Sequence, residues 1–202
     1  MRPLPLDVDY SSDYSKGTIH RVSVLLEEEL TRAIFVEAVE LVATDDELAA
    51  ISAELQLPVM FDTQHFGVLT LDRQISWFKG TINWNGSQID IQLHVEDNLD
   101  ITPQLATAEA LFVDSLTWSR RVQEFAVQKL LELANRWKED AEEDPEPICP
   151  AEFLRRMQLC SISIYADGEF EFWHDDGDLF WGHSIQISGS LSDGLKYANI
   201  PG

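Results

Sequence analysis

The residue types best suited to chemistry gather in the segment HDDGDLFWGH, which runs from His174 to His183. Asp175, Asp176 and Asp178 surround a glycine there, and carboxylate oxygens are the ligands that calcium and magnesium prefer. The flanking histidines add imidazole nitrogens, which suit a transition metal. The segment is therefore the candidate metal site of the chain, and a metal-binding module or a metal-dependent hydrolase is the chemistry it would support.

A turn without a metal explains the same acidic residues. Aspartate and glycine populate tight turns for conformational reasons alone. The spacing of an EF-hand loop is absent, and so is an HExxH pair. We therefore expect a solvent-exposed turn here and predict no cofactor, with calcium or a transition metal as the alternative.

The alternation of apolar residues places both histidines on the apolar face of a sheet, near Phe170, Phe172 and Trp181. A buried histidine has two ring nitrogens to satisfy, so each one needs a hydrogen-bond partner or a place at a cleft. We expect histidines at the rim of the sheet, bonded to backbone or to a carboxylate. A catalytic or binding role for His174, His183 and Trp181 is the alternative.

Trp77 and His94 are a second pair of candidate binding residues. Asn85-Gly86 is a strong signal for a two-residue hairpin turn, because both central positions require a positive φ. That turn puts Trp77 and His94 on the polar face of the hairpin. There we expect the two side chains to pack within the protein, and the alternative is that they form a contact surface for a partner. The register pairs Ile82 with Ile89, Gly80 with Ile91 and Phe78 with Leu93, and leaves Lys79, Thr81, Asn83, Gln88, Asp90, Gln92 and His94 on the polar face.

Other catalytic signatures are missing from the sequence. Ser184 follows Gly182-His183, but there is no GxSxG, and adjacent residues of a strand point to opposite faces. The glycines are scattered through turns and form no phosphate-binding loop. Cys149 and Cys160 are not in a CxxC pair, so we interpret them as structural or incidental thiols in a reducing compartment.

The charge balance narrows the choice of partner. The 202 residues include 36 acidic and 14 basic side chains, for a formal net charge of −22. Such a field repels phosphate backbones and anionic lipid, so we predict neither a nucleic-acid nor a membrane partner. It favours encounter with a basic protein, although acidity that only maintains solubility is a sufficient explanation.

No targeting or membrane segment is evident. Residues 1–17 lack the basic start and apolar run of a signal peptide. No apolar stretch approaches the roughly 18 residues that a membrane helix needs. We expect a cytoplasmic protein of undetermined oligomeric state.

The expected order of elements begins with a flexible leader over residues 1–17 and an N-terminal helical segment over residues 18–60. Thr18 to Leu26 fits a strand or the entry to a helix, and Glu27 to Val42 has helical spacing. Thr44 opens a second helix through a capping box. Residues 61–202 then hold a meander from Phe66 to Val95, a helical region from Thr102 to Lys138 that could break at Ser115, a short helix from Pro150 to Met157, and a meander from Cys160 to Ser190.

The second meander has a register of its own. A three-residue loop at Ala166-Asp167-Gly168 pairs Ile164 with Phe170 and Ile162 with Phe172, and places Cys160 and His174 on the same face. A turn at Asp176-Gly177 then adds Leu179, Trp181, His183, Ile185 and Ile187 to that face. The segregation of helices and strands indicates an α+β fold: antiparallel β-meanders packed on a long helix, with an N-terminal helical pair. Residues 18–60 and 61–202 are expected to form one compact unit.

The segments FGVLTLD, W-x-K-G, LANRW and DGDLFWGHSIQISG resemble an uncharacterised bacterial family, domain of unknown function 2262. The resemblance covers roughly Asp62 to Gly202, and it implies a cytosolic bacterial domain of mixed meander and helix. It implies no reaction, ligand or catalytic residue. The sequence as a whole predicts a non-enzymatic acidic interaction domain of an immunity or regulatory type. The alternatives are the metal-dependent protein and a small-molecule binder with a pocket between sheet and helix.

Overall fold

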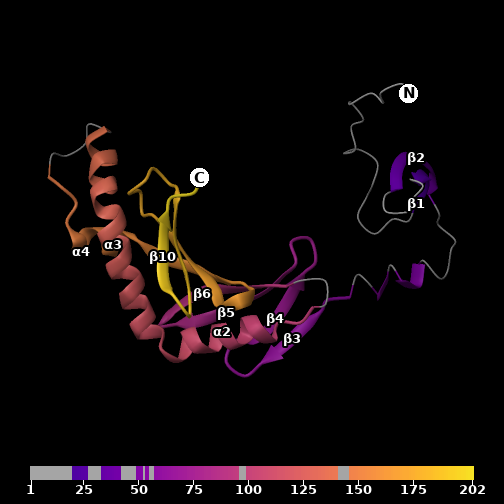
Figure 1. The fold of residues 1–202 in the computed structure, drawn as a ribbon, viewed down its shortest axis with the longest axis horizontal. Coiled ribbons are helices and arrows are strands. Elements are labelled where there is room, and N and C mark those ends of the chain that lie inside the picture. Colours follow the sequence, from indigo (N-terminus) through magenta and orange to yellow (C-terminus); the bar gives the residue numbers. More distant parts are fainter. Residues whose placement is uncertain are drawn as a thin grey trace. The chain divides into compact units, whose positions relative to one another are not determined.

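A computed structural model describes residues 20–26, 33–41, 49–51, 53–54, 57–95, 99–140 and 146–202. The chain divides into two compact units, Met1–Pro58 and Val59–Gly202 (Figure 1). The expectation that residues 18–60 and 61–202 form one compact unit stays a prediction.

The first unit contains a two-stranded antiparallel sheet. Strand β1 (His20–Leu26) pairs with β2 (Ala33–Leu41), with His20 opposite Leu41 and Leu26 opposite Ala33. The predicted helix from Glu27 to Val42 is therefore wrong over β2. The segment AIFVEAVEL is rich in β-branched and aromatic residues, which favour strands. The spacing of its apolar residues fits either a helix or a strand, and pairing with β1 makes it a strand. Residues 49–51 and 53–54 are helical, whereas the predicted capping box at Thr44 lies outside the described residues.

The second unit is built on one sheet of eight strands. These are β3 (Met60–Thr63), β4 (Gly67–Asp72), β5 (Trp77–Trp84), β6 (Ser87–His94), β7 (Gln158–Ile164), β8 (Glu169–Asp175), β9 (Ser184–Ser190) and β10 (Gly194–Asn199). The order across the sheet is β10-β9-β8-β7-β6-β5-β4-β3. Neighbours are antiparallel except β6 and β7, which are parallel. Two meanders of four strands thus join at β6 and β7 into a single sheet, and the fold is α+β.

The parallel junction follows from what separates the two meanders in the chain. Helices α2 (Thr102–Val113), α3 (Ser115–Asp140) and α4 (Pro150–Arg156) lie between β6 and β7. A connection of this length lets β7 start at the same end of the sheet as β6. The predicted break at Ser115 is confirmed. The Ser115 hydroxyl donates to Asn85 Oδ1 at 2.8 Å, which ties the start of α3 to the β5–β6 hairpin.

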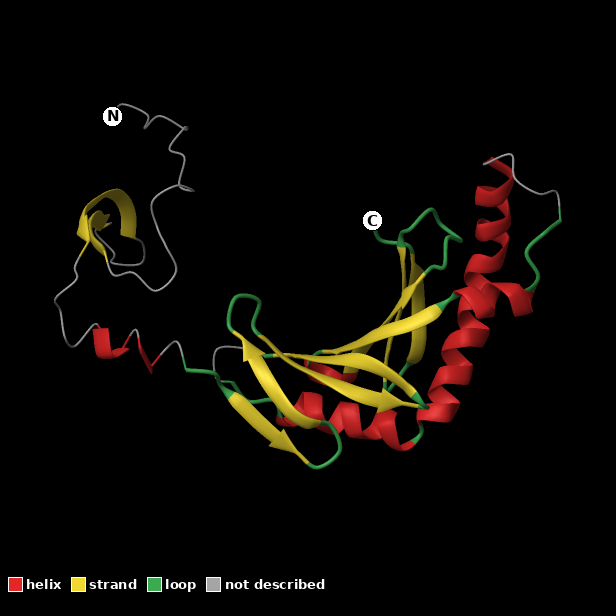
Figure 2. Ribbon diagram, turned by 180° about the vertical axis from the view of Figure 1, so that it is seen from behind, coloured by secondary structure: helices red, strands yellow, loops and turns green. Residues whose placement is uncertain are grey.

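Helices α2 and α3 lie along one face of the sheet (Figure 2), and the core fills the space between them. The predicted β5–β6 register is confirmed, with Ile82 opposite Ile89 and Phe78 opposite Leu93. At the start of α3, Leu116 is 75% exposed and lies outside the core. The core side chains that the sheet contributes are Leu69, Phe78, Ile82, Trp84, Ile89, Ile91, Leu93, Ile162, Ile164, Phe170, Phe172, Ile185 and Ile187.

The β7–β8 hairpin follows its predicted register, with Ile164 opposite Phe170 and Ile162 opposite Phe172. Asp167 and Gly168 both have positive φ, 61° and 77°. The prediction for Cys160 is wrong, because a register shift between Leu159 and Ser161 leaves Cys160 exposed. The outer strands β3 and β10 were not predicted. Each is short and pairs on only one side within the sheet, so its apolar alternation is weak.

Candidate binding face of the sheet

The face of the sheet opposite the helices is polar, and we call it the open face. Side chains alternate between the two faces of a strand, so every second residue belongs to it. One row of directly opposed residues crosses all eight strands, and its members are Met60, Thr70, Lys79, Gln92, Ser163, Glu171, Ser188 and Tyr197. The helices that the structure describes in Val59–Gly202 leave this face uncovered (Figure 2).

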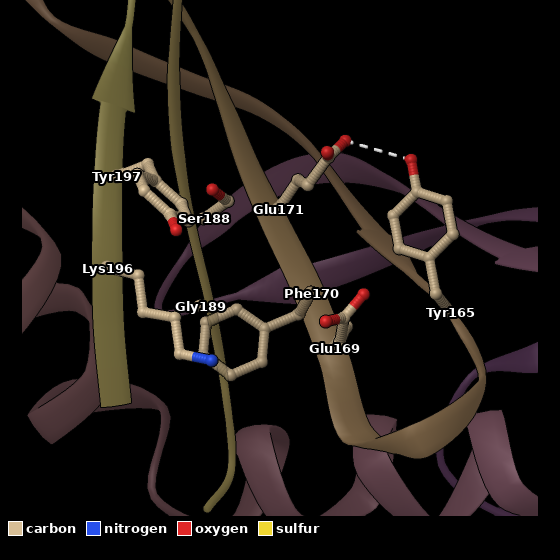
Figure 3. A pocket seen from close by; sticks show the side chains of 8 residues that line it. All are labelled: Tyr165, Glu169, Phe170, Glu171, Ser188, Gly189, Lys196 and Tyr197. Atoms are coloured by element: carbon tan, nitrogen blue, oxygen red, sulfur yellow. Dashed lines mark hydrogen bonds between the residues drawn. The ribbon is translucent and has the colours of Figure 1, made fainter. Parts of the chain in front are cut away.

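A pocket of about 330 Å³ lies on the open face over β8, β9 and β10. Its volume falls at the lower end of the range, about 300–1,000 Å³, that is usual for ligand sites. Figure 3 shows Tyr165 and Tyr197 on opposite sides of Glu171, with Ser188 between Glu171 and Tyr197. The pocket is lined by Tyr165, Glu169, Phe170, Glu171, Ser188, Gly189, Lys196 and Tyr197.

Glu171 is the fixed acceptor of this pocket. The Tyr165 hydroxyl donates to Glu171 Oε2 at 2.9 Å, and the Trp173 indole N–H donates to the same oxygen at 3.0 Å. Among the described residues, no donor reaches Glu171 Oε1 and no cation pairs with Glu171, whereas the charge of Glu169 acts on the Lys196 ammonium. Burial raises the pKa of Tyr165, and so do its hydrogen bond to Glu171 and the negative charges of Glu171 and Glu169. The phenol therefore stays protonated and keeps donating.

Lys196 is the cation of the pocket, and it is already engaged. Its ammonium pairs with Asp193 at 2.6 Å. It occupies the irregular position between Leu195 and Tyr197 in the β9–β10 pairing. Glu169 also attracts this ammonium, so Glu171 is the acceptor of the pocket whose described donors are all neutral.

The predicted pair Trp77 and His94 lies beside this pocket. Their ring centroids are 5.3 Å apart, and both rings contact Tyr165, at 5.3 Å from Trp77 and 5.9 Å from His94. The three rings form an aromatic cluster on the open face that ends at the pocket wall. Sequence reasoning missed Tyr165 because it follows the last residue of β7. The outward series Ser161, Ser163, Tyr165 is the signal that could have found it.

A second pocket of about 250 Å³ lies over β5 and β6, lined by Lys79, Gly80, Thr81, Asp90 and Gln92. The charged groups there have partners within the fold. The Lys79 ammonium pairs with Asp72 at 3.1 Å, and the Thr81 hydroxyl donates to Asp90 Oδ1 at 3.1 Å. The charged side chains of this second pocket therefore already have charged or polar partners within the protein, and the pocket has less to offer a ligand than the one around Glu171.

His174 lies on the opposite face of the sheet, in the core. It is 5% exposed and sits opposite Ile185 and Leu159. Its Nδ1 has no hydrogen-bond partner in the described part of the chain. Burial, the largest cause, lowers its pKa to about 4, against smaller upward effects of backbone hydrogen bonds with Ile185 and Phe172. His174 is consequently a neutral core residue at physiological pH.

His183 and Trp181 lie elsewhere, in the β8–β9 connection next to α3. The Trp181 ring lies 4.7 Å from the Trp137 ring, and the His183 ring lies 5.7 Å from the same ring. Trp181 is 59% exposed and has a positive φ of 57°. The structure therefore brings Trp181 and His183 together on α3, while His174 lies in the core and Trp77 and His94 lie on the open face.

A turn forms at Asp176-Gly177, where the Leu179 N–H donates to the Asp176 carbonyl at 3.1 Å. The strand predicted directly after this turn is wrong, since residues 176–183 form a longer connection between β8 and β9. Asp176 is not solvent-exposed but 3% exposed, and it organises this loop. Its carboxylate accepts backbone N–H bonds from Asp178 at 3.2 Å, Phe180 at 2.6 Å and Gly182 at 3.2 Å. The loop thereby buries Leu179 and Phe180 and takes the chain out of strand geometry.

The metal expectation rested on the same loop. Asp175 accepts from the backbone N–H of Gly177 at 2.8 Å, while Asp178 is exposed with a φ of 67°. Across the described residues, no group of three or more His, Cys, Asp or Glu side chains is placed to hold a metal ion. Metal binding by this loop stays a prediction.

Comparison with known proteins places the chain in a family. Residues 63–200 match the model of an uncharacterised protein conserved in bacteria, DUF2262, and the chain belongs to that family. No curated protein and no solved structure matches the chain. In the described part of the chain, no helix is long and apolar enough to cross a membrane.

Proposed function

We propose that this chain is a non-enzymatic binding domain that takes a basic segment of a partner protein on the open face of its sheet, in the bacterial cytoplasm. An immunity-type or regulatory role would fit such a module. The observation that carries the proposal is the pocket around Glu171. Glu171 lies between the half-buried Tyr165 and the exposed Tyr197, and the side chains that donate to it in the described part of the chain are both neutral.

The chemistry of the pocket favours binding over catalysis. Glu171 is fixed by two neutral donors, the phenol of Tyr165 and the indole of Trp173. The residues that line the pocket include neither a histidine nor a cysteine, and the one lysine pairs with Asp193. What remains is a set of oriented acceptors and aromatic rings, which suits recognition of a cation.

The charge of the whole chain supports the same partner. A formal net charge of −22 attracts a basic protein over a distance of about one Debye length and speeds their encounter. The aromatic cluster of Trp77, His94 and Tyr165 extends the contact area beyond the pocket. Aromatic residues contribute a large share of the binding energy in protein interfaces.

Binding of the full chain to a synthetic basic peptide, measured by calorimetry, tests the proposal. We expect binding that weakens by about tenfold or more as salt rises from low to physiological strength, and none to an acidic peptide of equal length. Glu171→Gln should weaken binding, whereas Glu124→Gln, which removes the same charge from an exposed position on α3, should not. Salt-independent binding, or equal effects of the two variants, would count against the open face as the site.

A further inference from the structure

The pocket around Glu171 offers acceptors in an arrangement that distinguishes the two common cationic side chains. Glu171 Oε2 is occupied by two donors, which leaves Oε1 as the acceptor that faces a ligand. Glu169 lies two residues earlier on the same face of β8, and positions spaced this way are about 7 Å apart. A ligand with several donors in one plane can contact both carboxylates at once.

We propose that this pocket binds the guanidinium group of an arginine in preference to the ammonium of a lysine. The inference rests on the proposed binding of a basic partner and specifies which side chain of that partner the pocket binds. A guanidinium carries five N–H donors in a plane and can reach both carboxylates, whereas an ammonium is a compact, strongly hydrated point charge.

The walls of the pocket favour the same ligand. Tyr165 and Tyr197 lie on opposite sides of Glu171 (Figure 3). A guanidinium stacks on an aromatic ring. It is also more weakly hydrated than an ammonium, so it loses less hydration free energy when it enters a pocket walled by aromatic rings. Tyr165 is held in place by its bond to Glu171 and by its contacts with Trp77 and His94. The wall on that side is therefore already ordered before a ligand arrives.

Lys196 also lines the pocket and sets a limit on the ligand. Its ammonium pairs with Asp193, on the edge strand side of the site. A ligand cation would therefore approach from the side of Glu171 and Tyr165, away from Lys196. Glu171 is the acceptor on that side, while Glu169 is shared between the ligand and the charge of Lys196.

The test compares two peptides of equal length and charge, one with arginine and one with lysine between glycines, binding to the full chain. We expect the arginine peptide to bind about fivefold more tightly or better. Its binding should also shift the NMR signal of the Trp173 indole N–H, because that group donates to the other oxygen of Glu171. Equal affinities for the two peptides would overturn the arginine preference and leave the binding of a basic partner standing, whereas no binding of either would overturn both.

Two variants of pocket residues and one control variant test whether the pocket is the source of the preference. Glu171→Gln should bring the two affinities within about twofold, while Asp90→Asn, which removes one charge from the second pocket of the same face, should keep the preference. Tyr197→Ala provides an independent check, since Tyr197 is 63% exposed and its loss removes one wall with little effect on folding. A preference that persists in both pocket variants would refute the assignment.

Discussion

Acidification should destabilise this domain through His174 before its carboxylates titrate. The imidazole is buried on the core side of β8, and its pKa falls from an ordinary 6.5 to about 4. Between these two values the unfolded chain binds a proton that the folded chain does not. The free energy of unfolding therefore keeps its full value above pH 6.5 and decreases as the pH falls toward 4.

The magnitude follows from the same two pKa values. Each pKa unit of difference corresponds to about 1.4 kcal/mol, so the complete loss is about 3 kcal/mol. From pH 7 to pH 5 the loss is about 2 kcal/mol, in a window where ordinary carboxylates are still mostly ionised. This is a large share of the about 5–15 kcal/mol that typically stabilises a domain.

Urea unfolding followed by tryptophan fluorescence measures this effect. All six tryptophans lie in Val59–Gly202, so the signal reports on that unit alone. Between pH 7 and pH 5, the free energy of unfolding of His174→Leu should fall by about 2 kcal/mol less than that of the unmodified protein. His65→Gln, at an exposed position, should behave like the unmodified protein. Equal losses in all three proteins, or an NMR titration of His174 centred near pH 6.5, would refute the reasoning.

Three further outcomes are expected. Asp176→Ala should lower the free energy of unfolding by about 3 kcal/mol, because three backbone N–H groups lose their acceptor. Asp178→Asn should lower it by under about 0.5 kcal/mol, because asparagine tolerates the positive φ of that exposed position, and similar urea midpoints for the two variants would contradict the role of Asp176. Gly189→Ala should cost about 2 kcal/mol or more, because its Cβ would overlap the Gly194 carbonyl, and unchanged stability would contradict that packing. Tyr165→Phe should leave the tyrosinate absorbance that develops around pH 10 unaltered, because Tyr165 does not ionise at that pH. A smaller absorbance change in the variant than in the unmodified protein would show that Tyr165 is an ordinary phenol.

Local pattern was sufficient for the hairpins of the second unit. Asn85, Gly86, Asp167 and Gly168 have the positive φ values that those residue types favour, and the predicted cross-strand pairs follow. The family assignment also follows from the sequence. These features depend on residues within a few positions of each other, so neighbouring side chains decide them.

Other elements required contacts that are distant in the chain. Residues 33–41 form a strand because β1 pairs with them, although their apolar spacing also fits a helix. Cys160 faces outward because of an irregularity in the pairing of β7 with β8. The loop after Asp175 departs from a simple hairpin because the Asp176 carboxylate binds three backbone groups along it.

The candidate residues of the HDDGD segment illustrate the same division. The sequence alone determined that histidines and aspartates gather around Gly177, that His174 belongs to the core side of a strand, and that Trp77 and His94 share a polar face. Only the tertiary structure separated His174 from His183, buried Asp176, and joined two meanders edge to edge between β6 and β7. That edge-to-edge junction creates a wide open face and brings Tyr165 beside Trp77. A period of two residues specifies which side chains share a face of one hairpin, but which strands become neighbours depends on how the helices between them pack.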